Sequence, residues 1–119
     1  LNPHCETLEK YSEEELILNP ALKTLKKNNI KISGPFSADT IFLKKNYEKY
    51  DVILGMYHDQ VLAPLKTLYG FSAINITIGL PFIRITVDHG PNNKMIGKNL
   101  SSPTSLIEIF NFIKNLRDI

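Results

Sequence analysis

The sequence has few of the features that mark several large protein classes. Its one cysteine, Cys5, cannot form a disulfide within the chain, which fits a reducing compartment, so we expect a cytoplasmic protein. No apolar run approaches the ~18 residues that a membrane-crossing helix requires, so no membrane is expected as a partner. The net charge is only +2, and no arginine-rich stripe is interleaved with aromatic residues, so no nucleic acid is expected either.

The common nucleotide-binding and hydrolase motifs are also absent. We find neither Gly-x-Gly-x-x-Gly, nor Gly-x-x-x-x-Gly-Lys followed by Ser or Thr, nor Gly-x-Ser-x-Gly, so any nucleotide must bind by other means. What is present is a globular composition, with 43% hydrophobic and 22% charged residues over 119 positions, the size of one ordinary domain.

Helical and extended patterns alternate along the chain. Helices are predicted at residues 12–18, 20–29, 38–49, 59–68 and 103–116, and strands at residues 30–33, 52–56, 73–78 and 82–87. Residues 52–56 are apolar on both faces, which is typical of a strand buried in a mainly parallel sheet. The alternation therefore predicts the α/β class, with helices flanking such a sheet.

Several helix ends carry recognisable signals. Ser12 and Glu15 have the spacing of a capping box, and Ser102 followed by Pro103 predicts the start of the last helix. Pro64 is expected to kink the helix that follows residue 58, or to delay its start.

Three histidines follow strand-like or apolar runs. His4, His58 and His89 each lie where such a run gives way to a loop, and neutral imidazole ligands are often displayed there. His58 follows the strand predicted at residues 52–56, whose carboxyl end would face the ligand crevice of an open α/β sheet. The spacing matches no local zinc signature, so spacing alone favours an ordinary, partly exposed loop residue over a metal ligand for each histidine taken singly.

Two aspartates are the immediate neighbours of these histidines. Asp59 follows His58, and Asp88 precedes His89. A carboxylate there can orient an imidazole, bind a metal itself or hold a substrate hydroxyl. Alternatively, Asp59 caps the helix that begins at its position.

A second group consists of Lys66, Asn75 and Arg84. Arg84 is the only cation in the apolar run of residues 82–87, and burying it unpaired would cost several kcal/mol. It therefore needs an anion, either an internal carboxylate or a ligand phosphate or carboxylate. Asn75 interrupts a β-rich run in the same way, or lies on the polar, outward face of that strand. A lysine at a helix end, such as Lys66, is most often simply solvated.

Six linked motifs resemble the 4-hydroxythreonine-4-phosphate dehydrogenases, enzymes of pyridoxal phosphate biosynthesis. They are residues 1–4 (LNPH), 34–40 (GPFSADT), 56–60 (MYHDQ), 75–77 (NIT), 79–84 (GLPFIR) and 87–90 (VDHG). Their order and spacing agree with that family over nearly the whole chain.

The resemblance implies an isocitrate/isopropylmalate-dehydrogenase-like fold and a homodimer with a shared active site. It implies NAD-dependent oxidation of a small phosphorylated substrate, 4-phosphohydroxy-L-threonine, followed by decarboxylation to 3-amino-2-oxopropyl phosphate. The family uses a divalent metal, here zinc, magnesium or cobalt, held by three histidines. Two of these match His4 and His58, and the third falls ahead of Leu1.

The resemblance also implies roles for other residues. The family's substrate-binding lysine, asparagine and arginine fall on Lys66, Asn75 and Arg84, at the same nine-residue steps. Asp59 and Asp39 are implied as catalytic residues that orient metal ligands or substrate. By analogy with the wider fold, the loop that holds His89, Gly90 and Asn92 would lie near the NAD adenosine.

The chain corresponds to the C-terminal portion of such a two-domain enzyme, so residues 1–119 alone are expected to be inactive. It departs from the family in residues 5–10 (CETLEK) and 91–97 (PNNKMIG), which replace smaller or differently ordered loops. These departures keep two alternatives open. One is a related metal-dependent decarboxylating dehydrogenase acting on another phosphorylated hydroxy acid. The other is a non-catalytic ligand-binding or association module.

Overall fold

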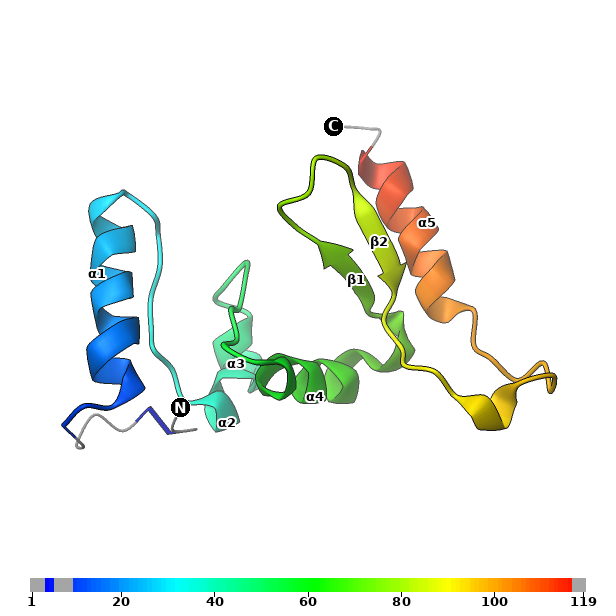
Figure 1. Ribbon diagram of the computed structural model, residues 1–119, viewed down its shortest axis with the longest axis horizontal. Helices are drawn as coiled ribbons and strands as arrows, with labels where there is room; N and C mark the ends of the chain where they lie inside the picture. Colours follow the sequence, from blue (N-terminus) through cyan, green and yellow to red (C-terminus); the bar gives the residue numbers. More distant parts are fainter. Residues whose placement is uncertain (1–3, 6–9, 117–119) are drawn as a thin grey trace. The chain divides into compact units, whose positions relative to one another are not determined.

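The computed structural model describes residues 4–5 and 10–116, which form two compact units (Figure 1). Unit 1 is Leu1–Met56, and unit 2 is Tyr57–Ile119. Within the described residues, no helix combines the length and the apolar character needed to cross a bilayer.

Unit 1 begins with one continuous helical stretch. A π-helical turn, η1 (Glu14–Leu18), runs directly into α1 (Asn19–Lys27), so the predicted break before Pro20 is wrong. Pro20 is the second residue of α1 and follows the π-helical turn, so its missing N–H falls where the π-helical pattern gives way to the α-helical one. Ser12 accepts a hydrogen bond from the Glu15 amide (3.2 Å), as predicted, and the Glu15 carboxylate accepts one from the Tyr11 amide (3.0 Å).

Helix α1 ends in a Schellman motif. The Ile30 amide donates to the Leu25 carbonyl, and the Asn29 amide donates to the Lys26 carbonyl, both at 3.1 Å. Asn29 has φ of 61°, the left-handed conformation that this motif requires and that asparagine tolerates. The helix therefore stops where its sequence pattern ends.

The rest of unit 1 is less regular than its sequence predicts. Residues 30–33 are extended but belong to no strand. The helix predicted at 38–49 is two short helices, α2 (Ala38–Ile41) and α3 (Lys44–Tyr47), because Leu43 between them adopts an extended conformation. The Asn46 side chain donates to the Thr40 carbonyl (2.8 Å) and joins the two.

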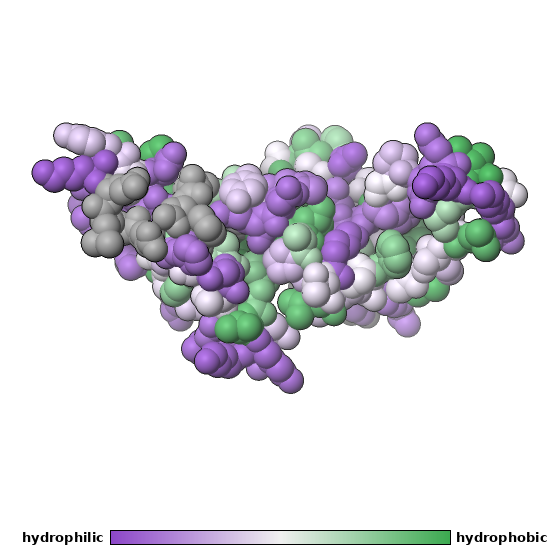
Figure 2. Space-filling model, turned by 90° about the horizontal axis from the view of Figure 1, so that it is seen from below, coloured by the Kyte–Doolittle hydropathy of each residue, from purple (hydrophilic) through white to green (hydrophobic). Residues whose placement is uncertain are grey.

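The buried strand predicted at residues 52–56 is also wrong for the described residues. The segment has no regular secondary structure and pairs with no described strand, and Val52 and Leu54 are 80% and 73% exposed. A strand depends on hydrogen bonds from an adjacent strand, which an apolar pattern alone cannot supply. Apolar side chains consequently reach the surface among polar ones (Figure 2).

Unit 2 begins with α4 (His58–Tyr69), which continues through Pro64 without the predicted late start. It ends at Gly70, whose φ of 57° favours glycine, and the short 3-10 turn η2 (Gly70–Ser72) leads to the first strand.

The sheet in the described part of the chain is a single antiparallel pair. Strand β1 (Ile74–Thr77) pairs with β2 (Arg84–Val87), with Ile74 opposite Val87 and Thr77 opposite Arg84. The predicted parallel sheet is therefore not confirmed. The short connection explains the direction, because parallel neighbours need a crossover of a dozen or more residues.

A 3-10 turn, η3 (Asn93–Met95), and helix α5 (Thr104–Leu116) complete unit 2, and α5 packs on both strands (Figure 1). Ser102 accepts a hydrogen bond from the Thr104 amide (3.3 Å), as its predicted capping role requires, although Pro103 lies just before the helix. The buried apolar side chains among the described residues are Ile41 in unit 1 and Ile109 in unit 2.

Candidate active site

The first candidate metal ligand, His4, lies beside Asp39 in unit 1. The His4 Nδ1 atom is 3.3 Å from the Asp39 Oδ2 atom, and both side chains are about half exposed. Asp39 lies in the first turn of α2, two residues after the cap residue Ser37. The sequence resemblance pointed to both residues, and the fold brings them together.

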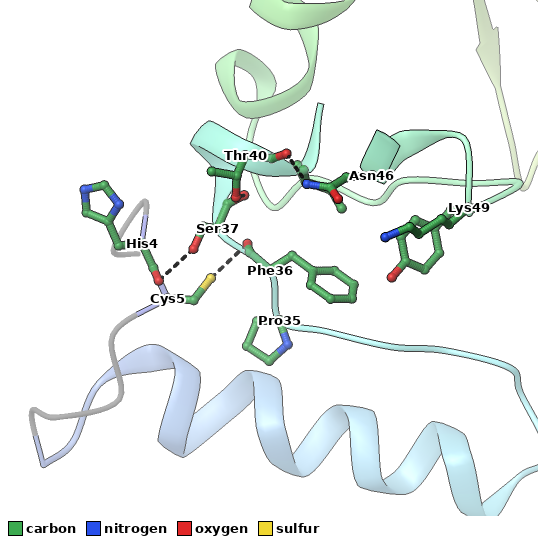
Figure 3. Close-up of a pocket in the computed structure, with 10 residues that line it drawn as sticks. His4, Cys5, Pro35, Phe36, Ser37, Thr40, Asn46 and Lys49 are labelled. Carbon is green, nitrogen blue, oxygen red and sulfur yellow. Dashed lines mark hydrogen bonds between the residues drawn. The ribbon is translucent and has the colours of Figure 1, made fainter. Parts of the chain in front are cut away.

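Two further hydrogen bonds hold the His4 segment in place (Figure 3). The Ser37 hydroxyl donates to the His4 carbonyl, and the Cys5 thiol donates to the Phe36 carbonyl, both at 2.9 Å. The backbone around His4 is thereby attached to the loop that leads into α2 and Asp39.

The second candidate ligand, His58, has an equivalent partner in unit 2. Its Nδ1 atom is 2.7 Å from the Oδ1 atom of Asp59, and both side chains are exposed. The two residues open α4, and the cap position is Tyr57, without a side-chain capping bond. The alternative in which Asp59 caps the helix is therefore wrong, and its carboxylate faces the imidazole instead.

Both pairs have the arrangement that prepares an imidazole for a metal. A carboxylate on Nδ1 fixes the ring and its tautomer, so Nε2 becomes the ligand nitrogen. Within the described ranges, however, no group of three His, Cys, Asp or Glu side chains is close enough to hold an ion. Each unit thus contains one such histidine–carboxylate pair.

A cavity of about 390 Å³ lies next to His4 in unit 1 (Figure 3). Its wall includes the aromatic pair Phe36 and Tyr50, whose ring centroids are 5.4 Å apart. Burial raises the pKa of the Cys5 thiol, which also lines the cavity, and the negative charges of Glu14 and Asp39 raise it further. Cys5 is therefore a protonated hydrogen-bond donor at neutral pH.

In unit 2, Asn75 and Arg84 lie on one face of the strand pair. Asn75 is opposite Thr86, and Arg84 is opposite Thr77, whose hydroxyl accepts a hydrogen bond from Arg84 Nη1 (2.9 Å). Alternate residues of a strand share a face, so these four polar side chains form one row.

Arg84 is exposed rather than buried, so the burial cost expected from its apolar surroundings does not arise. No carboxylate among the described residues forms an ion pair with it. The guanidinium fork is thus available to an anionic ligand.

Lys66 lies beyond the other end of this row. Its ammonium is 2.9 Å from the Asp88 Oδ2 atom and also donates to the Asp88 carbonyl. Asp88 follows β2 directly, so α4 and the end of β2 meet at this ion pair. The sequence singled out Asp88 only as a neighbour of His89 and gave no sign of its pairing with Lys66.

The candidate cofactor residues lie in the exposed loop that follows Asp88. His89 Nδ1 is 3.4 Å from the Gly90 carbonyl, and the Asn92 side chain accepts a hydrogen bond from the Lys94 amide (3.1 Å) at the start of η3. The Asn92 oxygen thus has a structural role in this loop. Gly90 lies within the turn, with open space around its α-carbon.

Sequence reasoning missed the contacts of two serines that organise these groups, although it predicted Ser37 as the cap of the helix beginning at Ala38. Ser37 anchors His4, and the buried Ser105 of α5 bonds to the Ala73 carbonyl and the Asp88 amide. The only signal in the sequence is that Ser105 is a small polar residue at the start of an apolar helix.

The sequence profile of the family described as pyridoxal phosphate biosynthetic protein PdxA matches residues 1–113. A 4-hydroxythreonine-4-phosphate dehydrogenase from Sulfurihydrogenibium sp. is 47% identical over 109 residues, which cover 91% of this chain and 33% of that protein. A protein of the same name from Xanthobacter autotrophicus is 43% identical over 119 residues, covering 99% of this chain and 34% of the relative.

A solved structure agrees with these matches. A Salmonella typhimurium protein, described as a 4-hydroxythreonine-4-phosphate dehydrogenase, aligns with a TM-score of 0.71 and 35% identity. The alignment covers 93% of this chain and 34% of that one. The chain thus spans about one third of the length of the relatives that it matches.

Proposed function

Because the chain belongs to the family of pyridoxal phosphate biosynthetic protein PdxA, we propose that it forms part of a dehydrogenase acting on 4-phosphohydroxy-L-threonine. The reaction is NAD-dependent oxidation of the substrate's secondary alcohol, followed by decarboxylation to 3-amino-2-oxopropyl phosphate. The names of the relatives support the activity. The observation that carries the proposal is that both motif histidines face carboxylates through Nδ1.

The polar row of unit 2 would bind the two anionic ends of the substrate. At about 3.3 Å per residue, the backbone from Arg84 to Asp88 spans roughly 13 Å. Lys66 lies at the Asp88 end, and Asn75 lies near the middle, opposite Thr86. Two cations separated by a neutral amide suit a molecule with a phosphate at one end and a carboxylate at the other.

His4 and His58 would hold the divalent metal, with Asp39 and Asp59 keeping their imidazoles oriented. Imidazole donors favour zinc or cobalt over magnesium, which prefers oxygen ligands. When bound, such an ion supplies a Lewis acid that lowers the pKa of the substrate hydroxyl and polarises the carbonyl formed from it. The protein's own contribution is to fix the ligands and the substrate ends relative to one another.

The loop that begins at His89 would lie along the NAD adenosine. It contains Gly90 and Asn92 and carries no carboxylate after Asp88, so the dinucleotide meets little negative charge. The dehydrogenase names of the relatives support a nicotinamide cofactor.

We further propose that the active protein is a cytoplasmic homodimer with a shared site and that residues 1–119 form the C-terminal portion of each subunit. Each unit offers one of the two candidate ligands, His4 and His58, so a third ligand would come from other parts of the assembly. The exposed apolar side chains of residues 52–56 would then be covered by neighbouring chain.

The test is NADH formation by the full-length protein with 4-phosphohydroxy-L-threonine, with and without a chelator. We expect turnover that the chelator abolishes and that added Zn²⁺ or Co²⁺ restores. A folded protein that turns over neither this substrate nor other phosphorylated hydroxy acids would rule out the enzyme and leave a binding module.

Residues 5–10, which follow His4 and differ from the family pattern, favour one alternative: a related decarboxylating dehydrogenase with another substrate. Cys5 lines the cavity next to His4, in a loop that differs from the family pattern. Turnover of another phosphorylated hydroxy acid in preference to 4-phosphohydroxy-L-threonine would indicate a related decarboxylating dehydrogenase instead.

A further inference from the structure

Ser105 joins both strands of unit 2 through one hydroxyl. Its side chain is only 2% exposed. The Oγ atom donates to the Ala73 carbonyl (2.7 Å), just before β1, and accepts from the Asp88 amide (3.2 Å), just after β2. Removing this hydroxyl would leave two backbone groups without their partner, so the position of Asp88 depends on Ser105.

Asp88 contacts the Lys66 ammonium through both its backbone carbonyl and its carboxylate. The Lys66 ammonium donates to the Asp88 carbonyl and lies 2.9 Å from the Oδ2 atom. The side chains are 31% and 16% exposed, and Oδ2 itself is shielded from solvent. The pair is therefore more constrained than an exposed surface ion pair, which is mobile and weakly coupled.

These contacts restrict how the ammonium can meet a ligand. A lysine ammonium has three N–H donors. One is directed at the Asp88 carbonyl, and the Asp88 carboxylate holds the ammonium as an ion pair. The centroid of the Phe71 ring lies 5.9 Å from Nζ. The ammonium thus keeps donor capacity for an oxygen atom outside the protein.

We propose that Ser105 and Asp88 are positioning residues, which fix the Lys66 ammonium so that it can donate to a phosphate or carboxylate oxygen of the substrate. The inference rests on the proposed function, because it assigns to Lys66 the binding of a substrate anion. Ser105 acts through its hydrogen bond to the Asp88 amide. Asp88 acts on the Lys66 ammonium through its carbonyl and its carboxylate.

The first test compares the steady-state kinetics of Ser105→Ala and Ile109→Val in the full-length, metal-loaded protein. Ile109 is the buried apolar residue one turn further along α5, so its shortening loosens the same helix without touching the hydrogen bonds. We expect Ser105→Ala to raise KM for 4-phosphohydroxy-L-threonine about tenfold, with kcat within about twofold. Ile109→Val should leave both nearly unchanged. Equal effects of the two variants, or a loss confined to kcat, would overturn the proposal.

The second test needs no turnover, so it separates this inference from the proposed function. Lys66 is labelled with acetic anhydride, and the rate is followed by mass spectrometry. We expect faster labelling in Ser105→Ala and in Asp88→Ala, which retains the Ser105 hydroxyl if the first variant fails to fold, but not in Ile109→Val. Unchanged labelling in both variants would overturn the inference. Absence of turnover in the unsubstituted protein would overturn the proposed function alone.

Discussion

Both histidine–carboxylate pairs join an imidazole Nδ1 atom to an aspartate oxygen, but they are built in different ways. His58 and Asp59 are neighbours in the first turn of α4, so their contact needs only a helix start. His4 and Asp39 are far apart in sequence, and their contact needs the loop before α2, held by Ser37 and Cys5. The same chemical unit can therefore arise from local sequence in one place and from tertiary contacts in another.

Removal of either histidine is expected to have the largest effect. In the full-length protein, His4→Ala and His58→Ala should each lower NADH formation at least about 100-fold, because losing a ligand exceeds the loss from a supporting carboxylate. The metal content after dialysis should fall in parallel. Lys44→Ala, on the surface of unit 1, serves as the control. Normal metal content and turnover in both histidine variants would refute the metal role.

Removal of either carboxylate should have an intermediate effect. Asp39→Ala and Asp59→Ala are each expected to weaken metal affinity about tenfold, because the imidazole loses the partner that orients it. Asp51→Ala, an exposed aspartate in unit 1, is the matched control. Titration with Zn²⁺ in competition with a chelating dye measures the effect. If only one of the two substitutions lowered Zn²⁺ affinity, the two carboxylates would not have the same role.

Loss of the Ser37 hydroxyl should affect only the pair of His4 and Asp39, which are far apart in sequence. Ser37→Ala removes one hydrogen bond to the His4 carbonyl, so we expect metal affinity to fall about fivefold, the size of one ordinary hydrogen bond. Ser101→Ala, at an exposed position, is the control. The same dye competition measures both variants, and a Ser37→Ala loss above that of Asp39→Ala would contradict this ranking.

The smallest expected effect is the contribution of the Cys5 thiol to the pH dependence of folding stability. Its thiol pKa is raised mainly by burial, so the folded state retains the proton more tightly than the unfolded state. The resulting stability is fully present below the unfolded thiol pKa, about 8.5, and is lost as the pH rises through the folded value. Urea unfolding should show a slight alkaline loss of stability that Cys5→Ala abolishes. Iodoacetamide should react more slowly with Cys5 than with free cysteine, and an equal rate would show that the thiol is not protected.

The same contrast between local and tertiary contacts explains which parts of the fold could be predicted. Helices α1, α4 and α5 follow from amphipathic spacing and from end signals such as Ser12 and Ser102, all of which are local. The strand predicted at 52–56 is wrong in this structure because an apolar run does not specify the neighbour that must pair with it. The short loop between β1 and β2 indicates an antiparallel pair. The prediction of a parallel sheet instead followed the alternation of helices and strands along the whole chain.

The candidate site divides in the same way. The contact of His58 with Asp59 could be predicted from adjacency, whereas the capping alternative could not be excluded without the position of Tyr57. The contact of Lys66 with Asp88 joins a helix to the end of a strand and leaves no trace in local spacing. Ser105 was missed for the same reason.

We propose that His4 and His58 bind the same metal ion in the full-length protein. A crystal structure of the full-length protein grown with Zn²⁺, with anomalous data collected at the zinc edge, tests it most directly. We predict a single peak bonded to Nε2 of both His4 and His58, with Asp39 and Asp59 still on the Nδ1 atoms. Separate ions on the two histidines, or a peak remote from both, would contradict the account.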